Sequence, residues 1–365
     1  MGWRVHVLIT TAMALVLALQ AAAQQTEASA GFDLQGTLSG MVAASTGTSD
    51  PPSDSYSAVG GLRLMLYPTW KLSRHWTVSG AYQLVTRQYY YSSFETRGQG
   101  VRGSIVQGTL RYSQVWNDAS LQVRAGELPT AFGAFPLRYD DRDNALVDLP
   151  MQYGYYGSLA TLGALTGVQA DVTWKKLDGR VQFTNSSPAN PRSVFGNGQY
   201  VNWAGGGGYT IRQGLRIGAS GYRGPYLDRE SPYFHHGEAS PRDLPGSGVG
   251  VEAEWGRGHW NVRGEWQRFV MAYKVIPTFH ERAGYVEVER TLGPRWYGAA
   301  RYGDLVADYA GRTDAVETVL GFRPGVGQIV KLSFETSREV KSGEIDRTVA
   351  VQFVTAIHPA FFARH

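Results

Sequence analysis

Residues 76–84 read Trp-Thr-Val-Ser-Gly-Ala-Tyr-Gln-Leu, so that mainly apolar positions alternate with mainly polar ones. Successive side chains of a β-strand point to opposite faces of a sheet, and this stretch therefore predicts a strand with one apolar and one polar face. Residues 168–175 (VQADVTWK) and 260–267 (WNVRGEWQ) repeat the two-residue period. A soluble β-sandwich rarely has room for so many long strands, whereas a barrel with a lipid-facing side and a wet interior does.

The alternation recurs along nearly the whole chain, and no long helical period is found. We therefore predict an all-β fold, a transmembrane antiparallel β-barrel of about 16 strands. The predicted strands are 32–45, 57–72, 75–90, 101–115, 119–127, 161–175, 180–186, 199–211, 214–223, 247–256, 259–270, 281–291, 295–305, 313–323, 328–338 and 345–357.

Short and long connections alternate between these strands. The short ones contain turn-forming residues or are short enough for hairpins, and the long ones are rich in Pro, Gly, Ser and Asp. Such alternation is typical of outer-membrane barrels, which have short periplasmic turns and long external loops. The short links are 73–74, 116–118, 176–179, 212–213, 256–258, 292–294 and 324–327, and the long ones include 46–56, 128–160, 187–198 and 224–246.

The amino terminus has the pattern of a secretory signal peptide. Arg4 is followed by an apolar run from Val7 to Leu19 and by three alanines, which predicts a signal peptide over 1–23 and cleavage before Gln24. No later apolar run approaches the ~20 residues of a membrane helix, which excludes a helical inner-membrane protein. Residues 24–365 are expected to form a single barrel domain, located in the outer membrane of a Gram-negative bacterium.

Composition supports the same class and excludes others. Aromatic residues make up 12% of the chain and charged residues only 18%, below the ~25% of ordinary soluble proteins. Tyr (21) and Trp (10) are the aromatic residues that membrane–water interfaces favour. The chain has no Cys, which excludes thiol chemistry, and its net charge of +4 is too weak a bias to indicate nucleic acid as a partner.

The fifth connection is the longest. It follows Arg124-Ala-Gly-Glu127 and begins Leu-Pro-Thr-Ala-Phe-Gly-Ala-Phe-Pro. The segment resembles the one in porins where a strand with an Arg-x-Gly pattern leads into a loop that contains Phe-Gly. The chain thus resembles the outer-membrane porin superfamily and is distantly similar to the phosphate-selective porin family. The resemblance covers the chain in architecture but only about 125–157 in motif. It implies that a loop between strands 5 and 6 folds inward and constricts the lumen, and that the protein is a homotrimer. The chain departs from the family at its end, where Phe361-Phe362 is not terminal, and in its basic residues, which cannot be matched to the family's phosphate-binding lysines and arginines.

Residue parity assigns side chains to the lumen if the apolar faces point to lipid. A basic lining opposite an acidic loop would create a transverse field that orients solutes and favours anions slightly. The expected pore-lining basic residues are Arg63, Arg87, Arg111, Arg124, Arg180, Arg216, Arg263 and Lys331, and the expected acidic residues of the constriction loop are Glu127, Asp140, Asp141, Asp143 and Asp148.

Each of these candidates also has a simpler interpretation. The inward arginines could pair with Glu265, Glu287, Glu289, Glu317 or Glu335 and stiffen the wall. The acidic residues of 138–143 could ligate a hard cation, although their spacing is not that of an EF-hand. Tyr89–Tyr91 and Tyr153, Tyr155 and Tyr156 favour an interfacial aromatic girdle over sugar stacking in the lumen. His235-His236 is expected to be an exposed loop pair rather than a metal site.

The sequence thus predicts a porin for passive diffusion of small polar or anionic solutes, with no cofactor and no metal. Its partners would be outer-membrane lipid and lipopolysaccharide, and not nucleic acid. An enzyme is not expected, because no Gly-x-Ser-x-Gly nucleophile motif is present. Two alternatives stay open: a secreted β-rich carbohydrate-binding protein and an outer-membrane barrel enzyme.

Overall fold

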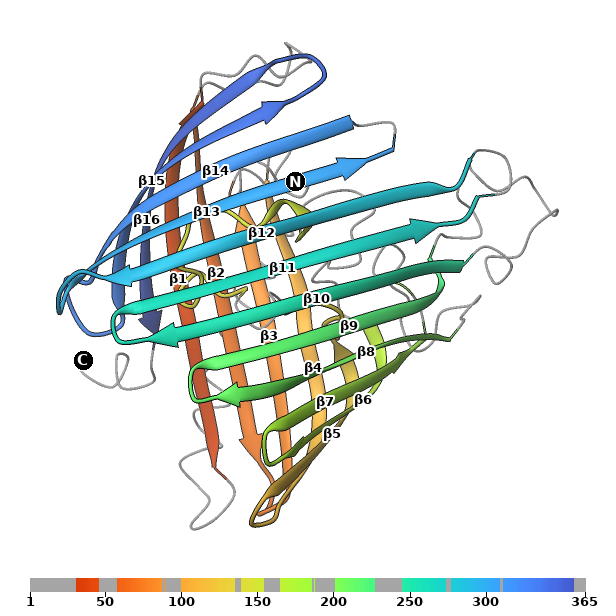
Figure 1. Ribbon diagram of the computed structural model, residues 1–365. Coiled ribbons are helices and arrows are strands. Elements are labelled where there is room, and N and C mark those ends of the chain that lie inside the picture. The colour runs from red at the N-terminus through yellow and green to blue at the C-terminus, as the bar shows by residue number, and fades with distance from the viewer. Residues whose placement is uncertain are drawn as a thin grey trace.

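The structure, a computed structural model, describes residues 31–45, 58–86, 89, 100–134, 139–153, 165–185, 187, 201–226, 245–273, 277–308 and 311–357. Within these residues, 16 strands pair in chain order as one closed antiparallel barrel, as predicted (Figure 1). The predicted signal peptide, Arg87 and His235-His236 lie outside the described residues.

The strands are 8 to 15 residues long. They are β1 (Phe32–Ser45), β2 (Ala58–Lys71), β3 (Trp76–Thr86), β4 (Val101–Val115), β5 (Ala119–Leu128), β6 (Leu165–Trp174), β7 (Leu177–Thr184), β8 (Asn202–Arg212), β9 (Leu215–Pro225), β10 (Pro245–Arg257), β11 (Trp260–Met271), β12 (Phe279–Thr291), β13 (Trp296–Ala307), β14 (Gly311–Phe322), β15 (Gln328–Glu339) and β16 (Ile345–Ile357).

The first and last strands close the barrel. Their pairing runs from Gly36 opposite Ile357 to Ser45 opposite Thr348, so no sheet edge is left open. The tight turns gather on one side of the barrel, at the lower left of Figure 1. The first residue of β1 and the last residue of β16 lie at this same end of the barrel. Phe32 of β1 pairs with Trp70, next to the β2–β3 turn, and Ile357 of β16 pairs with Gly36 of β1.

One predicted turn was misplaced. Residues 176–179 were expected to form the link before the seventh strand, but β7 already begins at Leu177, which pairs with Trp174. The chain reverses at Lys175 and Lys176, where Lys175 has a φ of 52°. Asp178 and Gly179, which suggested the turn, are therefore strand residues, and Arg180 lies fourth in β7 rather than first.

The outer face of the barrel is apolar, whereas the inner face carries many polar and charged side chains, unlike the surface and core of a soluble protein. On β2, Leu62 exposes 59% of its surface, whereas its neighbour Arg63 exposes 1%. On β15, Leu332 exposes 50% and Lys331 none. Exposed valines and leucines over so many strands exceed the apolar patches that monomeric soluble proteins carry. A closed sheet with this outer surface is suited to lipid.

Tryptophans mark the end of the barrel that carries the tight turns. Each lies in, or next to, the first or last residues of a strand beside a turn and exposes between 42% and 54% of its surface. An indole ring places an apolar body in lipid and a polar N–H near water, so this row forms an interfacial belt. Its members are Trp70, Trp76, Trp116, Trp174, Trp260 and Trp296. Among the described residues, no helix is long and apolar enough to cross a membrane.

Candidate functional site

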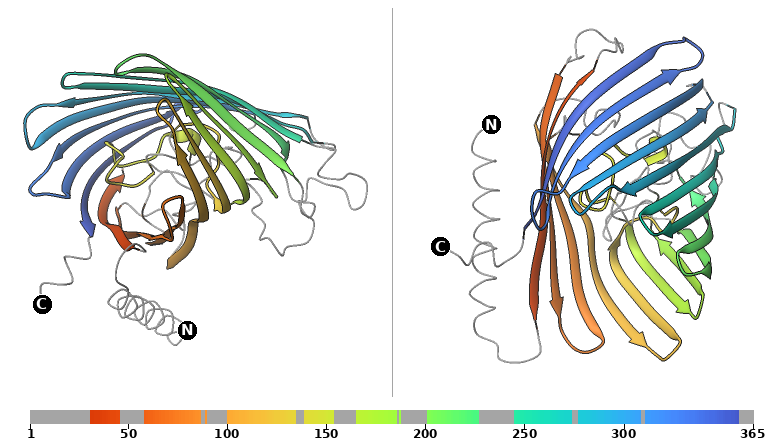
Figure 2. Two further views of the ribbon diagram at one scale, coloured as in Figure 1. Left: turned by 90° about the horizontal axis from the view of Figure 1, so that it is seen from below. Right: turned by 60° about the vertical axis from the view of Figure 1, so that its left-hand side comes forward.

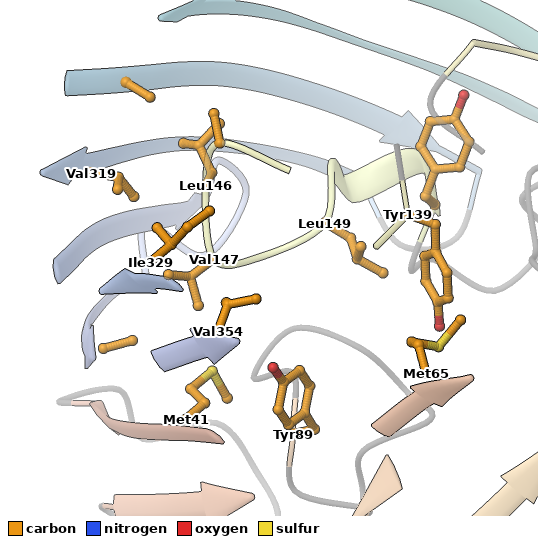
Figure 3. Close-up of a cluster of buried hydrophobic side chains, with 14 of the residues drawn as sticks. Met41, Met65, Tyr89, Tyr139, Leu146, Val147, Leu149, Val319, Ile329 and Val354 are labelled. Atoms are coloured by element: carbon orange, nitrogen blue, oxygen red, sulfur yellow. The ribbon is translucent and has the colours of Figure 1, made fainter. Parts of the chain in front are cut away.

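The connection between β5 and β6 is the segment that shapes the interior. Its described parts, 129–134 and 139–153, include the short helix η3 (Met151–Tyr153) and appear yellow within the ring of strands in Figure 2, left. Leu146 and Val147 are buried in a cluster with Val319, Ile329 and Val354, on β14, β15 and β16 (Figure 3). The connection therefore lies against strands that are far from β5 and β6 in the strand order.

Lys331 of β15 fixes the middle of the connection. Its Nζ donates to the backbone carbonyls of Asp141 (2.6 Å), Asn144 (2.8 Å) and Leu146 (3.0 Å). An ammonium group has three protons to donate, so these carbonyls account for its whole donor capacity. Because Lys331 is fully buried, its charge holds the connection and is not presented to solutes.

Arg63 of β2 binds the same part of the connection from another strand of the inner wall. Its Nη1 lies 2.9 Å from Oδ1 of Asp141 and 3.1 Å from the carbonyl oxygen of Tyr139. Its guanidinium also lies over the Tyr139 ring, 4.0 Å from the ring centre. The hydroxyl of Tyr89 donates to Oδ2 of Asp141 at 2.8 Å and accepts from Nε2 of Gln352 at 2.9 Å. Asp141 is thus the acceptor at the centre of a buried network.

The pKa of Asp141 follows from this network. Burial alone would raise it, but the charges of Arg63 and Lys331 and the hydrogen bond from Tyr89 lower the pKa below the ordinary value of 3.8. A carboxyl group with a lowered folded-state pKa stabilises the fold above its unfolded pKa, and this stabilisation is lost as pH falls toward the folded value.

This linkage predicts how Asp141→Asn depends on pH. From neutral pH to about pH 5, wild type should exceed the variant in unfolding midpoint by a constant amount, and the difference should shrink only as pH falls below the unfolded pKa. Urea unfolding in detergent micelles, followed by tryptophan fluorescence, measures it. If the difference already shrinks between neutral pH and pH 5, then the folded-state pKa of Asp141 is raised, which contradicts the network.

A row of alternating charges crosses the inner wall from β11 to β14. Arg263 is paired in register with Glu287, Glu287 with Arg301, and Arg301 with Glu317. The Arg263 Nε–Glu287 Oε1 distance is 3.0 Å, and Arg301 Nη2 lies 2.7 Å from Glu317 Oε2. All four side chains are almost completely buried. Arg263 thus forms one of the ion pairs that the simpler interpretation names, the pair with Glu287.

Glu317 links this row to the connection. Its Oε1 accepts the backbone N–H groups of Val147 (2.9 Å) and Asp148 (3.2 Å) and the hydroxyl of Ser333 (2.8 Å). Arg301 donates to the carbonyl oxygen of Asp148 at 2.7 Å. The inner wall therefore supplies acceptors for the backbone N–H groups of Val147 and Asp148 and a second donor for the Asp148 carbonyl, which also accepts from Asn144 Nδ2, as buried polar groups require.

The two ends of the connection are bound by further inward side chains. Gln182 of β7 accepts from the N–H of Ala131 at 3.0 Å, and Arg180 donates to the carbonyl of Gly133 at 2.6 Å. Glu265 of β11 accepts from the N–H of Ala134 and from the hydroxyl of Tyr153. Gly133 has a φ of 79°, and a Cβ there would lie 2.4–2.5 Å from the Tyr153 and Glu265 oxygens. Only glycine fits this position without displacement.

Three other expected basic residues lie on strands nearer the end of the barrel that carries the tight turns. They are Arg111, Arg124 and Arg216. Arg124 pairs with Asp171 at 2.8 Å, and Arg216 with Asp178 and Glu252, each at 2.6 Å. Arg111 lies directly opposite Arg124 in the β4–β5 register. These side chains are partly exposed, in contrast to Arg63, Arg263 and Lys331.

Some expected residues lie elsewhere than the sequence suggested. Glu127 belongs to β5, and the register places it opposite Thr166, with which it hydrogen bonds, on the outward face that also carries Val168. Tyr89 and Tyr153 do not join a girdle, because Tyr89 is buried against the connection and Tyr153, in the connection itself, is buried and donates to Glu265 of β11. Tyr90, Tyr91, Tyr155 and Tyr156 lie outside the described residues.

Arg301 was missed by the sequence analysis. Parity could have found it, since its neighbour Tyr302 exposes 47% of its surface on the outer face. Asp148 is buried at the end of this network, whereas Asp140, Arg142 and Asp143 face open space. No three His, Cys, Asp or Glu side chains in the described ranges are grouped so that they could hold a metal ion.

That open space is a cavity of about 320 Å³ between the connection and the inner wall of β1–β4. The connection contributes Tyr139, Asp140, Arg142 and Asp143 to its lining, together with Pro129. The wall contributes uncharged side chains, among them Gln35, Met65, Tyr67, Val106 and Gln107. The cavity is the space beside the connection that a solute could occupy.

No protein-family model and no curated protein sequence matches the chain. Solved structures with a similar fold include OmpF of Salmonella typhi in complex with daunomycin, the outer membrane channel DcaP of Acinetobacter baumannii and an anion-selective porin from Comamonas acidovorans. Their sequence identities are 11%, 12% and 11%, and each has a TM-score of 0.61. The matches cover 89%, 91% and 90% of this chain and 97%, 99% and 100% of the others.

The chain thus has the fold of outer-membrane porins over almost its whole length. Together with the apolar outer wall and the tryptophan belt, this fold places the protein in the outer membrane.

Proposed function

We propose that the protein is a porin through which small polar solutes diffuse passively, with the 129–153 connection as the constriction. One observation carries this proposal: the connection between β5 and β6 is anchored to inward side chains of β2, β14 and β15. Such anchoring gives a pore of fixed width without a chemical step. The partly exposed polar lining supports a wet passage.

The selectivity that we propose is a slight preference for anions. It would come from Arg111, Arg124, Arg180 and Arg216, which lie on the inner wall near the tight turns and keep part of their surface exposed. Arg63, Arg263 and Lys331 contribute little, because each is almost completely buried. Arg124, Arg180 and Arg216 are also bound to acids or to the connection, but they stay partly exposed. A field from partly exposed charges in a narrow aqueous passage biases which ions enter.

We also propose that the protein forms a homotrimer that contacts outer-membrane lipid and lipopolysaccharide. One solved structure with a similar fold, OmpT of Vibrio cholerae folded in vitro, is described as a trimer form; it is 11% identical, with a TM-score of 0.58 and coverage of 90% of this chain and 100% of the other. Cross-linking in detergent would give a ladder that ends at three subunits, and a monomer alone would contradict this part.

Vesicle swelling tests the diffusion function. Liposomes that contain the folded protein should swell in isotonic solutions of small neutral sugars, at rates that fall steeply as solute size increases. Protein-free liposomes and liposomes with heat-denatured protein are the controls. A folded protein that stays soluble without detergent and causes no swelling would favour the secreted carbohydrate-binding alternative instead.

Neutralising Arg111 and Arg124 should move the selectivity toward cations. These two arginines lie in adjacent strands on the inner wall, so Arg111→Gln with Arg124→Gln removes two positive charges from the same patch. The measurement is the reversal potential in planar bilayers under a salt gradient. The matched control is Arg312→Gln with Arg338→Gln, whose side chains pair with Asp304 and Asp314 on the outer face. An unchanged potential in the inner-wall variant would leave these arginines with a structural role only.

A further inference from the structure

The seven tight turns at one end of the barrel are strongly basic. Together with the strand residue on each side, these described segments contain eight lysines and arginines but one acid, Asp118. Three of the basic residues come from two adjacent hairpins: Lys175 and Lys176 form the β6–β7 turn, and Arg212 ends β8. All three side chains are exposed. This end of the barrel therefore presents positive charge that the ion pairs of the inner wall do not use.

The β6–β7 turn lies directly against the end of β8. The carbonyl oxygen of Lys176 accepts the N–H of Thr210 at 2.8 Å, and the Nζ of Lys176 lies 3.3 Å from the carbonyl oxygen of Ile211. Because Arg212 follows Ile211 in the chain, the two turns bring their cations to one place on the rim of the barrel.

The protein itself does not neutralise this charge. Among the described residues, no carboxylate forms an ion pair with Lys175, Lys176 or Arg212. Asp118, the acid of the β4–β5 turn, accepts the N–H of Lys175 through its backbone carbonyl at 2.8 Å. With Asp118 included, the three cations still leave a net positive charge, which an anionic partner would compensate.

Lys175 occupies a position that favours glycine. Its φ of 52° is the one positive φ of a non-glycine residue in the described part of the chain, and such a position in a two-residue hairpin turn is usually Gly. The Nζ of Lys175 lies 5.4 Å from the centre of the Trp174 ring. A lysine kept at a strained position supports a role for its side chain.

A row of apolar side chains lies next to the cations on the outer face. Trp174, Leu177, Tyr209 and Ile217 are opposite one another in the register of β6, β7, β8 and β9. Each of them exposes more than 40% of its surface. The row belongs to the outer surface that faces lipid. Cations beside such a row fit a molecule that has an anionic head and apolar chains.

We propose that this turn patch, which consists of Lys175, Lys176 and Arg212 with the apolar row beside them, binds the phosphate group of an anionic phospholipid. Tight turns of outer-membrane barrels lie on the periplasmic side, so the lipid would belong to the inner leaflet of the outer membrane. Its phosphate would accept from the three cations, and its acyl chains would lie along Trp174 and Tyr209. Basic residues at a membrane surface attract anionic headgroups, and indole rings favour the same depth. The proposal rests on the proposed contact with outer-membrane lipid and deepens it by naming the lipid class and the face that binds it.

Lipid retention in native mass spectrometry tests the turn patch. The folded protein in detergent micelles is mixed with dioleoyl phosphatidylglycerol or with dioleoyl phosphatidylcholine, which have the same acyl chains but differ in net charge. We expect half-maximal retention of phosphatidylglycerol at about tenfold lower concentration, because each basic residue near a headgroup adds to its attraction. Lys175→Gly and Lys176→Ser together with Arg212→Gln should abolish this difference. Because Gly suits the positive φ of residue 175, Lys175→Gly with Lys176→Ser alone should fold as stably as the wild type and lose most of the difference.

The matched control is Arg282→Gln with Arg312→Gln and Arg338→Gln, which removes three exposed cations from the outer face nearer the other end of the barrel. It should keep the preference for phosphatidylglycerol. Equal retention of both lipids by the wild type, or an unchanged preference in either turn variant, would overturn the turn patch. A protein that retains phosphatidylglycerol but carries no current in bilayers would instead refute the porin function, so the two failures are distinguishable.

Discussion

Lys331→Met should release the connection from the barrel wall and widen the pore. The variant removes a buried ammonium group that donates to the carbonyls of Asp141, Asn144 and Leu146, so all three acceptors lose this donor. It also removes a positive charge beside the buried Asp141. Removing one partner of a buried charged network costs about 3–5 kcal/mol. Because these bonds hold the middle of the connection, we expect the single-channel conductance to rise severalfold.

The measurements for this variant are unfolding in urea and conductance in planar bilayers. Lys341→Met is the matched control, since Lys341 is exposed in the turn between β15 and β16. It should keep wild-type stability and conductance. A Lys331→Met protein with both properties unchanged would show that the three carbonyl contacts do not hold the connection.

Arg301→Met should have an effect of similar size on stability. Arg301 lies between Glu287 and Glu317 in the buried row and also donates to the carbonyl of Asp148. Its loss leaves two buried carboxylates without their shared cation, which costs about 3–5 kcal/mol. Glu317→Gln in the same chain should restore part of this stability, since one of the uncompensated charges is then absent.

A double-mutant cycle of Arg301→Met and Glu317→Gln in urea measures this coupling. Arg338→Met is the control, because its partner Asp314 is on the outer face and the Arg338 side chain is largely exposed. We expect the control to remain close to wild type. Strict additivity of the two inner-wall substitutions would contradict the charge row.

The architecture could be predicted because it depends on local patterns. Alternation along each strand indicated which side chains face outward and which inward, and the order of short and long links indicated a barrel. The predicted number of strands and most of their boundaries agree with the structure. The turn at Lys175–Lys176 was misplaced because Asp178 and Gly179 are common turn residues, although here their strand pairs with β6 and β8.

The contacts across the lumen could not be predicted in the same way. Parity assigns Arg63 and Lys331 to the inner face, but whether they meet water or the connection depends on residues up to 190 positions away. Tyr89 shows the difficulty, because an aromatic residue near a strand end is as compatible with a girdle as with the buried bond to Asp141 that it makes. Such pairings depend on how the connection folds rather than on local sequence.

The measurement that tests the whole account most directly is the conductance of the purified, folded protein in a planar lipid bilayer. A barrel with a wet lumen should insert in discrete current steps whose size rises in proportion to the conductivity of the bathing salt. Folded protein that inserts into the bilayer without any current steps would mean that its interior is closed to ions, and the proposed transport function would be wrong.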